Sequence, residues 1–445
     1  MQWLTFAFTL LVMALLQRLA RTGGGPLEAR ATLALGFLVL AAHLGGVLAQ
    51  RLRVPRITGF LVTGFAAGPA WLGLVRPDEV QALSAISTGA LALIAFGAGA
   101  GLRLAALREQ GLAILRIALG AIGVPFVVVT FVVLTVSPWF PLTAHQPFRD
   151  AIAVALVLGT VAAVSSPAVT WALITDVGAT PRGLLSRTIL AVTVVQDAAA
   201  VLLMTLMLAL AQALASTGSV TPGLAAIAFL QLGGSVVVGV LLGAAIAQYV
   251  KVIRRHMVLV LVGVAFLVVQ GARLFGLEAA LMALAAGCTL ANFWPAESER
   301  LKAELTRCAL PVYVVFFAIA GCDLRLGALA QLWPWALLLI GLRITSLRAG
   351  LRWAGRHPAV GADLVTHGWL GLVTQAGLAI TLAAMLRRAF PEWGISLESL
   401  VVAMIGVHQV VGPLCFHWAL RKAGEVTEGA HVTEKSALVS GSSSV

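Results

Sequence analysis

A carboxylate lies in the middle of a long apolar stretch of this sequence. Asp197 follows Gln196 within a run from about residue 185 to 213 that contains no other acidic residue. A carboxylate at the centre of a membrane-spanning helix costs about 2.5 to 3.5 kcal/mol on insertion scales, so chains that keep one usually use it. Asp197 could bind a proton or a cation, or could be a structural carboxylate that hydrogen-bonds neighbouring helices. Gln196 could coordinate a cation through its amide oxygen but cannot titrate.

The composition indicates a membrane protein. Hydrophobic residues make up 60% of the 445 residues and charged residues 11%, too few polar side chains to cover a globular surface. The net charge of +12 comes mostly from basic residues in short loops between apolar runs, where they set orientation and do not indicate nucleic-acid binding. The four cysteines lack metal-ligand spacing, and we expect no cofactor.

Apolar windows long enough to cross a bilayer predict an all-α polytopic membrane protein with about 13 to 14 transmembrane helices. The predicted segments lie near residues 2–20, 31–50, 57–74, 83–104, 112–136, 150–175, 185–213, 223–249, 256–274, 277–293, 309–326, 331–355, 366–388 and 397–420. Basic residues concentrate in alternate loops, such as those holding Arg53, Arg187 and Arg300, so the positive-inside rule places both termini in the cytoplasm. The expected location is the bacterial inner membrane.

The segments divide the chain into two blocks of six helices. We predict an extra N-terminal helix and hinge over 1–26, a first repeat over 27–213, a linking helix over 214–255, a second repeat over 256–422 and a disordered cytoplasmic tail over 423–445. A single linking helix between two six-helix blocks gives them opposite orientations, as in the inverted repeats of many transporters.

Two of these segments are interrupted, each one segment before the end of its block. Pro167, preceded by Ser165 and Ser166, cannot donate to the helix ladder, so the helix kinks or unwinds there. The second interruption contains Thr374 and Gly377. An ordinary proline kink is the alternative. Freed backbone carbonyls inside a membrane persist where they face protein or a water-filled cavity, and hydroxyl side chains beside them are suitable ligands for hard cations.

Arg343 lies near the centre of the segment at 331–355, too far from either end to reach the interface easily. Its guanidinium stays protonated and needs an anionic or carbonyl partner. Asp197 and the carbonyl ends of the broken helices are the candidates, and Arg343 is predicted to compensate their charge. If the segment is shifted, Arg343 lies at an interface instead.

Other polar and small residues fit structural roles. Gly97, Gly99 and Gly101 suit close helix packing better than a phosphate loop. Three acidic residues lie at segment edges and are expected at the membrane interface: Asp150, Asp176 and Glu278.

Taken together, several stretches resemble the monovalent cation:proton antiporter superfamily, over about residues 32–425. Residues 53–60, Arg-Val-Pro-Arg-Ile-Thr-Gly-Phe, resemble its early helix signature, 165–169 its first crossing helix and 411–414 the start of its last conserved stretch. The Gln196–Asp197 pair is similar to the Gln-Asp form of the glutathione-gated potassium efflux branch, and Arg343 looks like the basic position of the third-last helix. The extra first helix and the missing C-terminal nucleotide-binding domain depart from that branch.

The resemblance implies a sodium/proton antiporter-like fold, with a moving core of segments 5–7 and 12–14 and a homodimer-forming scaffold of segments 2–4 and 9–11. It also implies a secondary transporter, not an enzyme, in which a sodium or potassium ion and a proton compete for Asp197. With Arg343 permanently charged, one titratable carboxylate predicts electroneutral 1:1 exchange. Two alternatives remain open: a proton-uncoupled potassium efflux pathway and a non-transporting membrane sensor.

Overall fold

The computed structural model describes most of the chain. The described residues are 26–105, 110–144, 146–179, 183–214, 222–253, 256–324, 327–376 and 394–426, together with positions 8, 11, 12, 15, 379 and 382. Three predicted features lie outside the described residues: the extra helix over 2–20, apart from positions 8, 11, 12 and 15, then Gly377, and the tail beyond residue 426.

Every named element of the described chain is a helix, as the apolar runs predict. The helices are α2 (Leu27–Arg51), α3 (Arg56–Ala67), α4 (Pro77–Ala82), α5 (Ser84–Ala100), α7 (Gly111–Thr135), α8 (Phe148–Ala162), α9 (Pro167–Asp176), α10 (Leu184–Leu214), α11 (Pro222–Ile253), α12 (Met257–Phe275), α13 (Ala279–Phe293), α14 (Pro295–Arg307), α15 (Ala309–Cys322), α16 (Gly327–Ala354), α17 (Ala362–Gly371) and α19 (Gly394–Lys422). The all-α polytopic architecture is confirmed.

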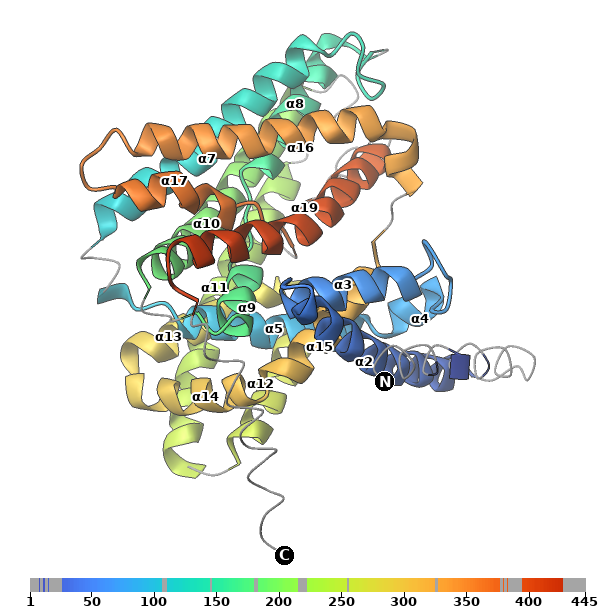
Figure 1. Ribbon diagram of the computed structural model, residues 1–445. Helices are drawn as coiled ribbons and strands as arrows, with labels where there is room; N and C mark the ends of the chain where they lie inside the picture. The colour runs from blue at the N-terminus through green and yellow to red at the C-terminus, as the bar shows by residue number, and fades with distance from the viewer. Residues whose placement is uncertain are drawn as a thin grey trace, which may run out of the picture.

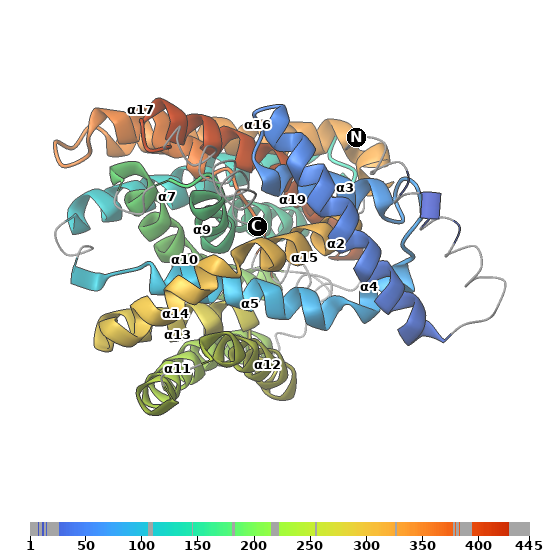
Figure 2. The same ribbon diagram turned by 60° about the horizontal axis from the view of Figure 1, so that its bottom comes forward.

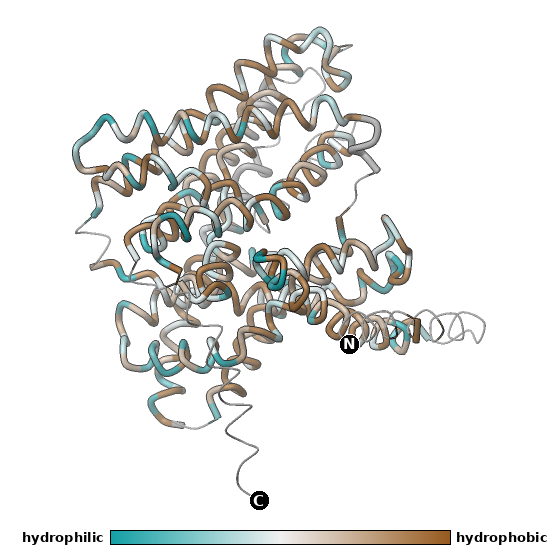
Figure 3. The backbone as a smooth tube through the Cα atoms, viewed as in Figure 1, coloured by the Kyte–Doolittle hydropathy of each residue, from teal (hydrophilic) through white to brown (hydrophobic). Residues whose placement is uncertain are grey.

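Within the described residues, eight spans are long and apolar enough to cross a membrane, or nine if the bent pair α14 and α15 counts as one span. This is fewer than the predicted segments because some predicted segments are shorter apolar helices, namely α3, α5 and α13. Figure 3 shows that hydrophilic residues lie mainly at helix ends and turns, whereas the middles of the helices are hydrophobic. The chain is an integral, multi-pass membrane protein.

One helix lies where the sequence predicts a loop. The stretch around Arg300 forms α14, which begins with Pro295 in its first turn and buries Leu301 and Leu305 on one face. Proline is favoured at the start of a helix because its missing N–H has no partner there in any case. The remaining residues of α14 are largely charged, so no apolar run indicated this helix.

The helices form two groups (Figure 1). The crossing group consists of α7, α8, α10, α16, α17 and α19, which pack on one another, and all but α17 contribute to an apolar cluster within the group. The flanking group consists of α2, α3, α4, α5, α11, α12, α13, α14 and α15. Helix α9 belongs in sequence with α8 but packs against both groups, and Figure 2 shows α11 and α12 on the side of the molecule away from α16 and α17.

Glycines permit the closest helix contacts in the flanking group. A Cβ atom added to Gly99 of α5 would lie 2.0 Å from the Leu284 carbonyl oxygen, and one added to Gly287 of α13 would lie 2.1 Å from that of Phe96. Neither distance is sterically allowed, so α5 and α13 can approach this closely only because both residues are glycine. The predicted packing role of Gly99 is therefore confirmed.

We expect Gly287→Ala to lower the melting temperature of the purified protein, because backbone atoms of α5 cannot move aside as a side chain could. Overpacking of this kind typically costs about 1 to 3 kcal/mol. Gly263→Ala in α12 is the matched control, because nothing lies within 4 Å of its added Cβ. Alanine is the better helix former, so the control should be neutral or slightly stabilising. Equal effects of the two substitutions would contradict the close-contact explanation.

Candidate functional site

The first break interrupts a membrane span completely. Helix α8 ends at Ala162 and α9 begins at Pro167, and the chain between them leaves the helix, with Ser166 in an extended conformation. Ser166 caps α9, since its hydroxyl accepts a hydrogen bond from the backbone N–H of Val169 at 3.3 Å. A serine cap followed by proline is a favoured helix start, so the local sequence encodes a new helix here instead of a bend.

The second break lies beside the first. Helix α17 ends at Gly371 and the chain is non-helical through residue 376. The Ser166 backbone N–H donates to the Thr374 carbonyl at 3.0 Å, and the Ser165 hydroxyl donates to the Leu372 carbonyl at 2.7 Å. The two unwound segments are therefore hydrogen-bonded to each other inside the crossing group.

Arg343 connects both breaks. Its side chain extends from α16 and is completely buried. At the first break it donates to the carbonyl oxygens of Ala162 at 3.1 Å and Val164 at 2.6 Å; at the second it donates to those of Leu372 at 3.0 Å and Val373 at 2.8 Å. Of the two candidate partners, the structure thus places the carbonyl ends around the guanidinium. Among the described residues no ion pair joins Arg343 to a carboxylate.

Two buried amides also donate to the carbonyls of the first break. The Gln375 side chain donates to Val161 at 2.8 Å and to Val164 at 3.2 Å, and the Gln196 side chain donates to Ala163 at 3.1 Å. Many of the backbone carbonyl oxygens that the break frees from helical hydrogen bonding therefore accept hydrogen bonds from other protein groups. This leaves side-chain oxygens as the main ligands available to an ion.

Asp197 lies on α10, whose first turn is held by the C-terminal end of the described chain. The Glu425 carboxylate accepts hydrogen bonds from the backbone N–H groups of Leu185 at 2.6 Å and Ser186 at 2.9 Å. A carboxylate at a helix N-terminus satisfies unpaired N–H groups and interacts favourably with the helix dipole. The contact fixes the start of the helix that carries Asp197.

Asp197 lines a cavity between the two helix groups. The cavity, including its opening to solvent, spans about 430 Å³ of space between atoms, and Ser165, Ser166 and Pro167 line it together with Asp197. The Asp197 Oδ1 atom is buried and has no hydrogen-bond partner among the described residues. Gln196 and Thr374 are not among the described residues that line the cavity. They lie in the layer of residues behind it.

Glu278 lines the same cavity from the opposite side. The sequence placed it at a segment edge, and the structure adds that it shares this cavity with Asp197. It precedes α13, caps that helix by accepting from the Leu281 N–H, and donates its own backbone N–H to the Ser235 hydroxyl at 2.8 Å. Only Gly276 and Leu277 separate α12 from Glu278, so a short turn carries this carboxylate to the cavity.

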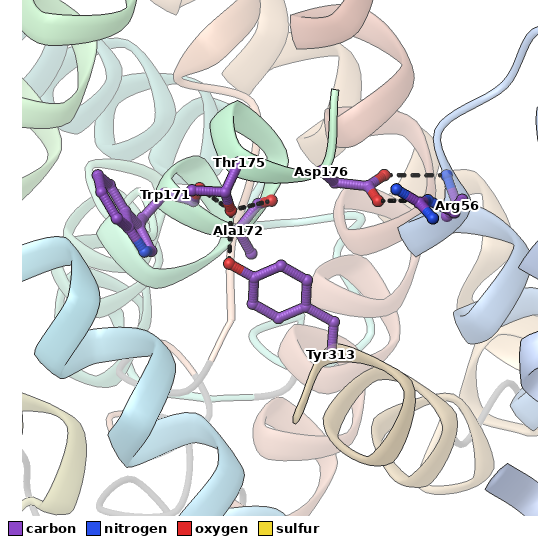
Figure 4. A network of polar contacts seen from close by, with 6 residues as sticks. All are labelled: Arg56, Trp171, Ala172, Thr175, Asp176 and Tyr313. Atoms are coloured by element: carbon purple, nitrogen blue, oxygen red, sulfur yellow. Dashed lines mark hydrogen bonds and ion pairs between the residues drawn. The ribbon is translucent and has the colours of Figure 1, made fainter. Parts of the chain in front are cut away.

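A polar network at the C-terminal end of α9 joins this helix to the flanking group (Figure 4). The Asp176 carboxylate accepts hydrogen bonds from the backbone N–H and the Nε of Arg56, both at 3.0 Å. The preceding residue, Thr175, is hydrogen-bonded through its hydroxyl to the Tyr313 hydroxyl of α15. The Asp176 side chain is buried at this helix end and only 3% exposed.

We expect Arg56→Gln to lower the free energy of unfolding by about 3 kcal/mol, because the substitution leaves a buried carboxylate without its cation. Arg103→Gln is the matched control. It breaks the pair of Arg103 with Glu299, whose side chains are 60% and 53% exposed, and such pairs contribute about 0 to 1 kcal/mol. Thermal unfolding in detergent measures both, and similar losses would contradict a special role for the buried pair.

Comparisons with known proteins agree with this geometry. The family model described as sodium/hydrogen exchanger, transmembrane, matches residues 38–422. Among solved structures, the chain is similar to the sodium proton antiporter MjNhaP1 from Methanocaldococcus jannaschii, with a TM-score of 0.64 and 17% identity, over 90% of this chain and 99% of that one. At this identity the likeness concerns the fold. A comparison with curated proteins found no match.

Proposed function

The chain belongs to the sodium/hydrogen exchanger family, and from this premise we propose that it exchanges a monovalent cation, sodium or potassium, for a proton by alternating access. The observation that carries the proposal is the buried, unpartnered Asp197 Oδ1 in a cavity between two helix groups. A dehydrated carboxylate is costly in its charged form. A proton removes that cost, and so does a bound cation, so the two compete for one site.

The ligands of the cation are then hard oxygens. Asp197 supplies charge, and Ser165 and Ser166, whose hydroxyl oxygens are further ligands in this proposal, line the same cavity. Oxygen ligands of this kind suit alkali-metal ions. Gln196 and Thr374 act from behind the cavity: the Gln196 amide holds the Ala163 carbonyl, and the Thr374 carbonyl receives the Ser166 N–H, so both fix the break that presents the serines.

Alternating access needs two bodies that move against each other. The hydrogen bonds of Arg343 to both breaks make the crossing group one unit, and the cavity lies where this unit meets the flanking group. In this proposal the crossing group moves, the flanking group forms a homodimer, and both termini face the cytoplasm of a bacterial inner membrane. Only Asp197 carries a titratable charge across, which gives electroneutral 1:1 exchange.

The test is transport by purified protein in liposomes with an imposed pH gradient and a trapped pH-sensitive dye. Sodium, potassium or lithium is added to the outside, and the ion that collapses the gradient at the lowest concentration is the substrate. Protein-free liposomes give the background. Failure of all three ions across the pH range, with folded and inserted protein, would overturn the proposal.

Stoichiometry is measured on the same preparation. Recordings on solid-supported membranes report net charge moved per turnover, and electroneutral exchange gives no steady transport current. A current that depends on the cation but not on the pH gradient would support a proton-uncoupled efflux pathway instead.

A further inference from the structure

Two carboxylates from different helix groups face one cavity. Asp197 comes from α10 of the crossing group, and Glu278 comes from the start of α13 in the flanking group. None of the ion pairs in the described part of the chain includes either residue. Two carboxylates without basic partners beside one cavity favour a cation between them.

Capping of α13 does not by itself explain a glutamate at position 278. The side chain accepts the Leu281 N–H with its Oε2 atom, and the backbone N–H of Ala280 also contributes to the cap. Ser, Thr, Asp and Asn are the residues preferred at this position, because their shorter side chains reach the backbone more easily. A glutamate provides the cap and also places its carboxylate side chain among the residues that line the cavity. The positive end of the helix dipole makes that charge less costly.

We propose that Glu278 is a second, stationary ligand of the transported cation. The inference rests on the proposed function and deepens it. In the conformation described here the cation is bound by Asp197, Ser165 and Ser166 from one side and by Glu278 from the other. When the crossing group moves, Asp197 and the serines go with it, whereas Glu278 remains with α13.

This arrangement makes the site asymmetric without changing the stoichiometry. The Glu278 charge does not cross the membrane with the site, so the exchange of one proton for one cation at Asp197 still moves no net charge. The cation, however, meets two carboxylates on one face of the membrane and one on the other. Its affinity is therefore higher on the face where Glu278 completes the site.

The decisive variant is Glu278→Gln, because the amide oxygen still accepts the Leu281 N–H and the side-chain volume is retained. Transport is measured in right-side-out and in inside-out membrane vesicles, which present opposite faces to the added cation. We expect the apparent KM for the cation to rise about 10- to 100-fold on one face, since a charged ligand is lost there, and to change less than about twofold on the other. Glu299→Gln on the exposed surface of α14 is the matched control and should leave both values unchanged.

An unchanged KM on both faces would overturn the inference. An equal rise of KM on both faces together with a lower melting temperature would overturn it too, because that result indicates a purely capping role.

Thermal stabilisation of the purified protein by sodium, potassium or thallium chloride supplies a readout independent of transport. We expect cation stabilisation in the wild type and its loss in both Glu278→Gln and Asp197→Asn. If the wild type binds a cation through both residues but does not exchange protons, the proposed function fails and the cation site stands. If no cation stabilises the wild type, the site fails as well.

Discussion

Asp197→Asn should abolish cation-dependent collapse of a pH gradient while leaving the protein folded. Asparagine has nearly the same size as aspartate but can neither bind a proton in this range nor offer a negative charge to a cation. Both substrates therefore lose their shared site. We expect the rate in the liposome assay to fall to the protein-free background, a loss of at least about 100-fold, as expected when a charged partner of a buried ion is removed.

Two further variants make this prediction specific. Asp363→Asn removes an exposed carboxylate from the first turn of α17 and should retain wild-type transport. Asp197→Glu restores the charge on a longer side chain, so we expect weak transport with altered preference among sodium, potassium and lithium. Transport by Asp197→Asn at the wild-type rate would show that the carboxylate is structural.

Arg343→Ala should cause the largest loss of stability of any single substitution considered. The guanidinium donates to four buried carbonyl oxygens of the two breaks, of which Val164 and Leu372 keep a second donor, and each buried acceptor left unsatisfied costs about 1 to 3 kcal/mol. We expect a loss of about 4 kcal/mol or more, which is close to the whole stability of many proteins. The measurement is the yield and melting temperature of monodisperse protein in detergent.

Arg343→Lys separates charge from geometry. An ammonium keeps the positive charge but has three donors on one nitrogen, and it cannot span two breaks as the planar guanidinium does. We expect a melting temperature between those of the wild type and Arg343→Ala. Arg352→Ala, on an exposed position of the same helix, serves as control and should change little. A fully stable Arg343→Ala protein would contradict the bridging role that the hydrogen bonds indicate.

The sequence predicted the helices well wherever a long apolar run defined them. It also predicted an interruption at Pro167, because proline chemistry acts locally, and it predicted that Arg343 needs an anionic or carbonyl partner. It could not choose between Asp197 and the carbonyls as that partner. The choice depends on how α16 packs against α8 and α17, which no local pattern encodes.

Other features were missed for similar reasons. Helix α14 has a mostly charged sequence, so a search for apolar windows passes over it. Glu278 was assigned to the interface because a segment boundary fell beside it, and no local pattern indicated that it would line the same cavity as Asp197. Its place opposite Asp197 follows from the packing of α13 on α5, which depends on glycines far apart in the sequence.

The four carbonyls held by Arg343 also bear on the kinetics of the proposed cycle. A transporter with unwound helices could in principle work by winding and unwinding them, and each turnover would then break backbone hydrogen bonds inside the membrane. Here one guanidinium holds both breaks, so such local refolding would first have to strip it of its partners. The low-energy route leaves the breaks intact and slides the crossing group along the flanking group. The activation barrier then arises from contacts such as Arg56 with Asp176, at the boundary between two rigid surfaces.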